Sequence, residues 1–306
     1  MHWLPTRALF GLSLVFLLAT TAPAQITPAL AEGDVVAGVG TVTRIDNLAI
    51  NDFGQWLVEA DTDNTNTDTD QVLVRDGALY LQEGQALPAP PGATLDSFDS
   101  INLNNNGDSG WNFFLDGTSG TGDDSGIYFN TALVIQESDI STAPEFTPGT
   151  PYIGFFDAKI RANNSDGLMS IASVDDPAIA SSVDRAIVRI QHDGAGNLVS
   201  ESVLRKEGDI PPGQTEAVAD FGTGPHQSAF NDGGAILHFV DLAGDTGMDG
   251  CFYLDDTLLA QKGAPRRSQA GTTSSSPAVV AISATAARMC TRPAWTGIPR
   301  RTRSSS

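Results

Sequence analysis

Short apolar runs alternate with clusters of Asn, Asp, Ser, Thr and Gly along most of the chain. Several runs also alternate apolar and polar side chains, as at residues 98–103. Alternation with a period of two is typical of half-buried strands, and no stretch beyond residue 36 sustains the 3.6-residue apolar period of a helix. The pattern therefore predicts an all-β chain of short strands joined by tight turns.

The clearest recurring element is an Asn, two further residues and a Gly between two strand-like runs. An Asn side chain at the start of a turn can bond to its own backbone, and a Gly at the end takes the positive φ that closes a bulged hairpin. We interpret these residues as structural turns. The four pairs are Asn51 and Gly54, Asn104 and Gly107, Asn164 and Gly167, and Asn231 and Gly234.

Successive turn asparagines are 53, 60 and 67 residues apart. Periods of about this size are typical of propellers and related arrays. Each period also holds four strand-like runs, which in the first unit fall at residues 42–50, 56–60, 71–74 and 78–81. We therefore predict a repeat domain over residues 37–263. Its four units are residues 37–91, 92–148, 149–213 and 214–263.

Four strands joined by hairpins form a four-stranded antiparallel sheet, which has two faces to bury. Stacking successive sheets buries these faces, and closing the stack into a ring leaves only short edges. The sequence therefore predicts repeated four-stranded sheets in a β-propeller-like arrangement, which an incomplete or open ring also fits. The alternatives are a β-sandwich and an open stack of sheets.

The first residues have the features of an export signal. Arg7 precedes an apolar run over residues 8–19, and Ala22-Pro23-Ala24 offers a small-residue cleavage site. The run is shorter than the roughly 18 apolar residues of a membrane-spanning helix, and no second apolar run follows. We predict a signal peptide over residues 1–24, a linker over residues 25–36, and a secreted or cell-surface protein with no membrane span after signal removal.

The charge balance limits the classes of molecule that can be a partner. The chain has 37 acidic and 17 basic residues, and its net charge is −20. A polyanion such as nucleic acid would be repelled, so we exclude it as a partner. An extracellular glycan or protein remains as a partner class.

Residues 264–306 differ from the rest because they contain seven Arg and no Asp or Glu. One interpretation is a native basic, disordered tail. We favour translation in a shifted reading frame, because a fifth unit is due here and Gly- and Asp-rich codons read one base out of register give Ala, Arg, Thr, Pro and Ser. The nucleotide sequence distinguishes the two, since only the second requires an open frame that continues the repeat.

An acidic loop in the first unit is a candidate Ca²⁺ site. Its carboxylates alternate with Thr and Asn, and oxygen ligands at every second position suit Ca²⁺. The EF-hand pattern fails, because Asn66 stands where its Gly should be and Val72 where its Glu should be. The alternative is a solvated turn-rich loop. The candidate ligands are Asp61, Asp63, Asp68 and Asp70.

No catalytic motif is present in the sequence. It has no Gly-x-Ser-x-Gly elbow, no phosphate-binding loop and no Cys-x-x-Cys pair. The four histidines are scattered, and we interpret Cys251 as a small apolar strand residue without a disulfide to Cys290. A pair of carboxylates for glycoside hydrolysis cannot be located from sequence, because the required separation is spatial. Enzymatic activity is therefore an alternative and not the first expectation.

The repeated turn resembles the unit of the bacterial choice-of-anchor tandem-repeat proteins, Asn-x-x-Gly-x-x-Ala-Phe. The copy that begins at Asn51 has Leu57 and Val58 in the last two places, and the copy at Asn164 has Ser170 and Ile171 there. The copy at Asn104 departs further. The resemblance covers about residues 37–263, and it implies export and surface display in a bacterium, with no established catalytic residues.

Three functions follow from these observations. The first is a secreted or surface-displayed, non-catalytic scaffold that binds a glycan or protein. The second is an extracellular propeller hydrolase or lyase that acts on polysaccharide through carboxylates, with Ca²⁺ as a possible cofactor. The third is a truncated gene product that has no function of its own.

Overall fold

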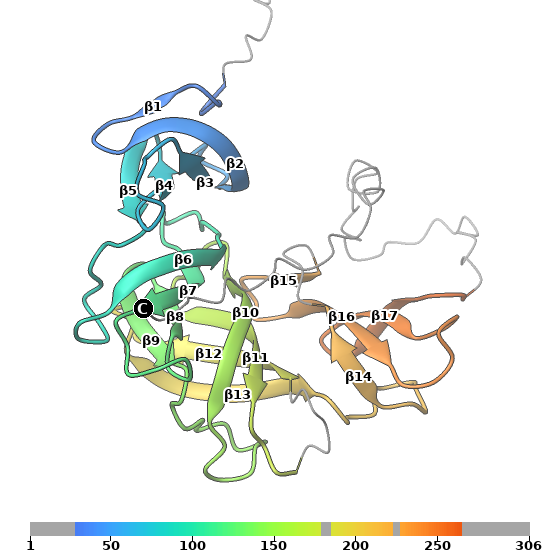
Figure 1. Cartoon of the computed structure of the whole chain (residues 1–306). Helices are drawn as coiled ribbons and strands as arrows, with labels where there is room; N and C mark the ends of the chain where they lie inside the picture. The colour runs from blue at the N-terminus through green and yellow to red at the C-terminus, as the bar shows by residue number, and fades with distance from the viewer. Residues whose placement is uncertain (1–27, 179–184, 223–226, 265–306) are drawn as a thin grey trace, which may run out of the picture. The chain divides into compact units, whose positions relative to one another are not determined.

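A computed structural model describes residues 28–178, 185–222 and 227–264. The predicted signal peptide lies outside these residues, as do most of the basic tail, His2, His226 and Cys290. All regular structure in the described part is β, in four sheets (Figure 1). This confirms the predicted all-β fold.

Each sheet is formed by one continuous stretch of the chain, and all strand pairs are antiparallel. The first sheet contains β1 (Val35–Val36), β2 (Gly40–Ile50), β3 (Trp56–Thr62), β4 (Gln71–Arg75) and β5 (Ala78–Gln82). The second contains β6 (Thr94–Ser100), β7 (Gly110–Asp116), β8 (Ser125–Phe129) and β9 (Ala132–Gln136). The third contains β10 (Tyr152–Ile160), β11 (Gly167–Val174), β12 (Arg185–His192) and β13 (Leu198–Lys206).

The fourth sheet departs from the pattern in its first strand. It contains β14 (Val218–Phe221), β15 (Ser228–Phe230), β16 (Ile236–Leu242), β17 (Gly250–Leu254) and β18 (Thr257–Gln261). Both β14 and β15 pair with β16, so together they occupy the place that one strand takes in the earlier sheets.

Three of the four Asn-x-x-Gly turns form as predicted. The Asn51 Oδ1 atom accepts hydrogen bonds from the amides of Phe53 (3.1 Å) and Gln55 (3.0 Å), and Gly54 has a φ of 76°. The turn glycines Gly107 and Gly234 both have a φ of 83°. The side chains of Asn104 and Asn231 accept the equivalent amide bonds from Asp108 and Ala235, both at 2.8 Å.

The prediction for the third turn is wrong at Gly167. β11 begins at Gly167 itself, which pairs with Gln191 of β12, whereas β3 begins two residues after Gly54. Gly167 therefore has the extended backbone of a strand, outside the positive-φ region. Asn164 still accepts a bond from the Asp166 amide at 3.0 Å.

A second structural feature, which the sequence did not predict, also repeats. In three sheets the last strand (β5, β9 or β18) ends with a Gln, whose side-chain amide donates to the carbonyl thirteen residues earlier. The pairs are Gln82 with Thr69 (2.7 Å), Gln136 with Asp123 (2.7 Å) and Gln261 with Met248 (2.8 Å). Each of these bonds fixes the loop before the next-to-last strand to the end of the last strand. These units therefore repeat in side-chain detail as well as in topology.

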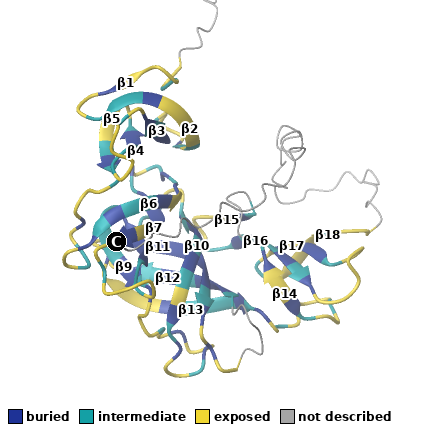
Figure 2. Ribbon diagram, in the orientation of Figure 1, coloured by how far each residue is buried: buried dark blue, intermediate teal, exposed yellow. Residues whose placement is uncertain are grey.

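The hydrophobic cores lie between successive sheets. Leu57 and Leu73 of the first sheet pack in one cluster with Trp111 and Phe113 of the second. Similar clusters join the second sheet to the third and the third to the fourth. Figure 2 shows the buried residues that run along these strands. Successive units therefore stabilise one another face to face, as in a propeller.

Cys251 is a fully buried residue of β17 with a free thiol. It packs in the cluster between the third and fourth sheets.

Candidate functional site

Three strands in successive sheets, β2, β6 and β10, each contain a bulge that involves an Asp. The pairing register shifts between Ile45 and Asn47, where Asp46 lies, and likewise around Asp99 in β6 and Asp157 in β10. A bulge leaves a residue out of the ladder and redirects its side chain. Three carboxylates thus take related positions in three units.

Glu59 is a fourth carboxyl group, and it lies close to Asp46 and Asp99 of these bulges. It lies on β3, pairs with Leu73, and is only 6% exposed. Among the described residues, no hydrogen bond or ion pair engages its carboxyl group. Burial raises the pKa of Glu59 to about 8, and the neighbouring charges of Asp46, Asp61 and Asp99 add to the rise. The group is therefore mostly protonated at pH 7.

Asp99 has a different environment, because it is exposed to solvent while its carboxylate is held by protein. Its Oδ2 atom accepts a bond from Asn112 Nδ2 at 2.7 Å. Desolvation raises the pKa of Asp99, and the bond from Asn112 and the charge of Lys159 counteract this rise. Glu59 and Asp99 are thus neighbouring carboxyls with unequal access to water.

Asp157 is buried within β10, where it has a φ of 46°. A non-Gly residue in this region costs roughly 1–3 kcal/mol of backbone strain. Its Oδ1 atom pairs with Lys159 Nζ at 2.5 Å, and its Oδ2 atom accepts a bond from the Ser228 hydroxyl. Burial raises the pKa of Asp157, and Lys159 opposes the rise. Because Ser228 belongs to β15, this bond joins the third and fourth units.

Polar bonds in the interior connect Asp99 to the third sheet. Asn112 donates to Asp99 and to the Phe155 carbonyl (3.2 Å), and it accepts a bond from the Ser100 hydroxyl at 2.7 Å. The amide of Ala158, next to Asp157, donates to Ser100 Oγ at 3.0 Å. These bonds hold the bulges of β6 and β10 together.

We name this group the carboxyl row. It consists of Asp46, Glu59, Asp61, Asp99 and Asp157 together with the cations Arg44 and Lys159. Arg44 pairs with Asp46 at 2.7 Å and with Asp61 at 3.0 Å, whereas Lys159 pairs with Asp157. Arg44 also lowers the pKa of Glu59, and Lys159 that of Asp99, so five carboxyl groups share two cations. The row therefore presents an excess of hydrogen-bond acceptors and negative charge.

The four predicted Ca²⁺ ligands take separate roles. Asp61 faces Arg44, and the Asp63 Oδ1 atom accepts a bond from the Thr41 amide at 2.6 Å, which lowers the pKa of Asp63. Asp68 is exposed and Asp70 half-buried. Within the described ranges, no three Asp, Glu, His or Cys side chains gather closely enough to hold a metal ion. The geometry favours the alternative, a loop stabilised by its own polar bonds.

The Asn-x-x-Gly turns also join neighbouring units. Asn51 Nδ2 donates to the Asn104 carbonyl at 2.9 Å, and Asn105 Nδ2 donates to Asp52 at 2.8 Å and to Asn163 at 2.6 Å. Asn163 in turn donates to Asp232. Middle residues of three turns, together with Asn163 just before the third turn, thus form a polar ladder through all four units, which the sequence motif alone did not reveal.

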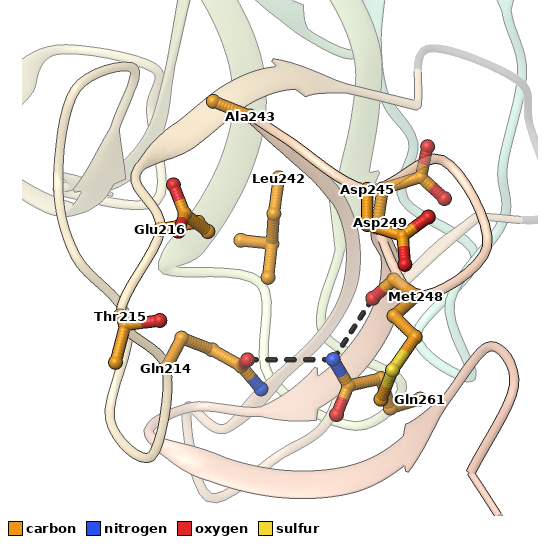
Figure 3. Close-up of a pocket in the computed structure, with 9 residues that line it drawn as sticks. All are labelled: Gln214, Thr215, Glu216, Leu242, Ala243, Asp245, Met248, Asp249 and Gln261. Carbon is orange, nitrogen blue, oxygen red and sulfur yellow. Dashed lines mark hydrogen bonds between the residues drawn. The ribbon is translucent and has the colours of Figure 1, made fainter.

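A pocket of about 250 Å³ lies in the fourth unit (Figure 3). The side chains of Glu216, Asp245 and Asp249 surround Leu242, and Gln261 donates to Gln214 at 3.4 Å. None of the carboxyl-row residues lines this pocket. Asp249 pairs with Lys262 at 3.0 Å, which neutralises one of the three carboxylates of the pocket.

The two described histidines are core residues. His192 packs on Phe129 with ring centroids 4.5 Å apart, and burial lowers its pKa. His238 stacks on Tyr253 at 5.8 Å, and its pKa falls to about 4, mainly because of burial. Both are therefore neutral structural side chains at pH 7.

No family model, curated protein or solved structure matches this chain. Among the described residues there is also no helix long and apolar enough to cross a membrane. The resemblance to choice-of-anchor repeat proteins stays a prediction that rests on the turn motif.

Proposed function

We propose that this chain is an exported, non-catalytic scaffold that binds a cationic, hydroxyl-rich glycan at the carboxyl row. The apolar run and cleavage site before residue 25 support export, and the resemblance to bacterial surface repeat proteins supports surface display. The observation that carries the ligand proposal is Glu59, which is nine-tenths buried, unpaired and flanked by further acids.

The chemistry of the row matches such a ligand. Ammonium groups of the ligand would pair with carboxylates such as Asp99, and its hydroxyl groups would donate to the carboxylate oxygens. The net charge of −20 would also attract a cationic polymer over a longer range. A neutral glycan gains only the hydrogen bonds, so it is expected to bind more weakly.

Titration calorimetry with two matched oligosaccharides tests this proposal. A glucosamine hexamer, which is cationic at pH 6, is expected to bind, and its neutral N-acetylated counterpart to bind much more weakly. Asp99→Asn is expected to weaken binding of the cationic hexamer about tenfold, because it removes a charge-assisted hydrogen bond. The control is Asp116→Asn, an exposed residue outside the row, which is expected to leave the affinity unchanged.

Equal binding of the two hexamers would contradict the cationic ligand. Equal effects of Asp99→Asn and Asp116→Asn would contradict the row as its binding site. A basic peptide of equal charge is the second probe, and tighter binding of the peptide would indicate a protein partner in place of a glycan.

A second function is favoured by the unequal environments of Glu59 and Asp99. A protonated carboxyl beside a more exposed carboxylate is the arrangement that general acid–base catalysis of glycoside cleavage requires. If the chain is a polysaccharide hydrolase, the wild type would release reducing ends from the glucosamine polymer. Glu59→Gln would then abolish this release, since an amide cannot donate a proton to the leaving group. Binding without release by the wild type supports the scaffold.

A further inference from the structure

The outer face of the fourth sheet is apolar, and no residue of the described ranges covers it. Leu237 pairs with Leu254 and Phe239 pairs with Phe252 on this face, where the two phenyl rings meet edge to face at 5.1 Å. Phe252 is 37% exposed and Leu254 is 38% exposed. We name the patch formed by Leu237, Phe239, Phe252 and Leu254 the terminal face.

The same face is covered in the earlier sheets. Equivalent positions in β3, β7, β11 and β16 can be found from one backbone hydrogen bond at the start of each strand. The carbonyls at these starting points accept the amides of Asp76, Asn130, His192 and Asp255, respectively. Counting from these points, Phe239 corresponds to Glu59, Asn112 and Met169, which are all buried. Met169 packs against the fourth sheet, and Asn112 bonds to the third. Each earlier sheet is therefore covered by the next, and the fourth has no such cover among the described residues.

The opposite end of the stack is already covered by its own chain. Val36 of β1 packs on Val42, Val58 and Val72 of the first sheet, together with Leu30. This N-terminal cover blocks a second molecule from stacking head to tail on the first sheet. The terminal face is thus the uncovered end of the described stack.

Residues 265–306 contain no Asn and no Asp, so they carry none of the turn residues on which each unit is built. A second copy of the chain can supply a sheet face of the required kind. The terminal face also carries charges of both signs, since Asp241 and Lys262 line the same hollow as Phe239 and Phe252, although Lys262 already pairs with Asp249 of its own chain at 3.0 Å. A face with both charges is complementary to itself across a two-fold axis.

We propose that two copies of this chain pair through their terminal faces, like against like, around a two-fold axis. Phe239 and Phe252 of each copy would cover those of the other, and Asp241 of one copy would face Lys262 of its partner. Because the N-terminal cover prevents head-to-tail stacking, the assembly would close as a dimer and would not grow into a fibre.

Light scattering coupled to size-exclusion chromatography of the full chain tests the proposal. We expect twice the monomer mass at micromolar concentration. Phe252→Lys is expected to weaken the dimer roughly thirtyfold or more, as loss of a central aromatic contact does in other interfaces. The matched control is Phe53→Lys, an exposed apolar residue (76%) in the first turn, which is expected to leave the dimer intact.

Charge exchange provides an independent variant that does not disturb the apolar packing. Asp241→Lys is expected to weaken the dimer, and adding Lys262→Asp in the same chain is expected to restore it. A wild-type monomer at 100 µM would overturn the proposal, as would dimer loss in Phe53→Lys but not in Phe252→Lys. A ladder of larger oligomers would also overturn it, because it would indicate head-to-tail stacking.

Discussion

Glu59→Gln is expected to raise the free energy of unfolding at pH 9 by roughly 4 kcal/mol and to leave it unchanged near pH 4. The pKa of Glu59 is about 8 in the folded chain, above the ordinary value of 4.5. The folded state therefore holds its proton more tightly than the unfolded state does. Stability from this group is present below pH 4.5 and is lost as the pH rises to about 8.

The physical reason is that Gln stays neutral at every pH. The wild type must either ionise a buried group beside three acids or keep a proton that the solution no longer favours. Urea unfolding at pH 4, 6.5 and 9, followed by circular dichroism, measures the difference. Glu32→Gln, at an exposed position, is the control and is expected to change stability by less than about 0.5 kcal/mol. An equal effect of Glu59→Gln at all three pH values would contradict the buried, unpaired carboxyl.

The second large effect is expected at the interface between the first two units. Trp111→Ala should destabilise the chain by about 3–5 kcal/mol, the usual range for a fully buried Trp. Trp111 is fully buried, and its ring lies 5.9 Å from Tyr80 of the first sheet and 5.0 Å from Phe113. Its Nε1 atom also donates to the Asn130 carbonyl at 2.6 Å.

The same substitution tests the stacking of units. In a repeat array, a weakened interface lets a terminal unit unfold separately. We therefore expect Trp111→Ala to split one cooperative thermal transition into two, with the first unit melting at the lower temperature. Phe53→Ala, at an exposed site, is expected to leave the transition unchanged. A broad, non-cooperative transition of the wild type would instead favour the truncated gene product.

The turns and strands could be predicted because their causes are local. An Asn that bonds its own backbone and a Gly with positive φ form a hairpin almost regardless of what surrounds them, as at Asn51 and Gly54. The prediction failed at Gly167, because β11 begins at the Gly itself, which pairs with Gln191 of β12. Loop length depends on how the strands pair, which the motif does not encode.

The carboxyl row could not be predicted, because bulges and burial depend on neighbouring sheets. One signal was present: Asp46 and Asp99 each lie five residues before a turn asparagine. Glu59 looked like any strand residue, since only the second sheet makes it buried. The acidic loop from Asp61 to Asp70 was predicted to be a Ca²⁺ site from a local sequence pattern. A metal site and a solvated loop share this pattern, so the sequence could not distinguish them.

The pKa of Glu59 is the most direct test of the row. Carboxyl-carbon NMR of the full chain with ¹³C-labelled Glu, assigned by comparison with Glu59→Gln, would follow its titration from pH 3 to pH 10. We predict a midpoint near 8, several units above that of an exposed Glu. A midpoint near 4.5 would show that the group is solvated or paired with a cation, and it would contradict the buried, unpaired carboxyl on which the row is centred.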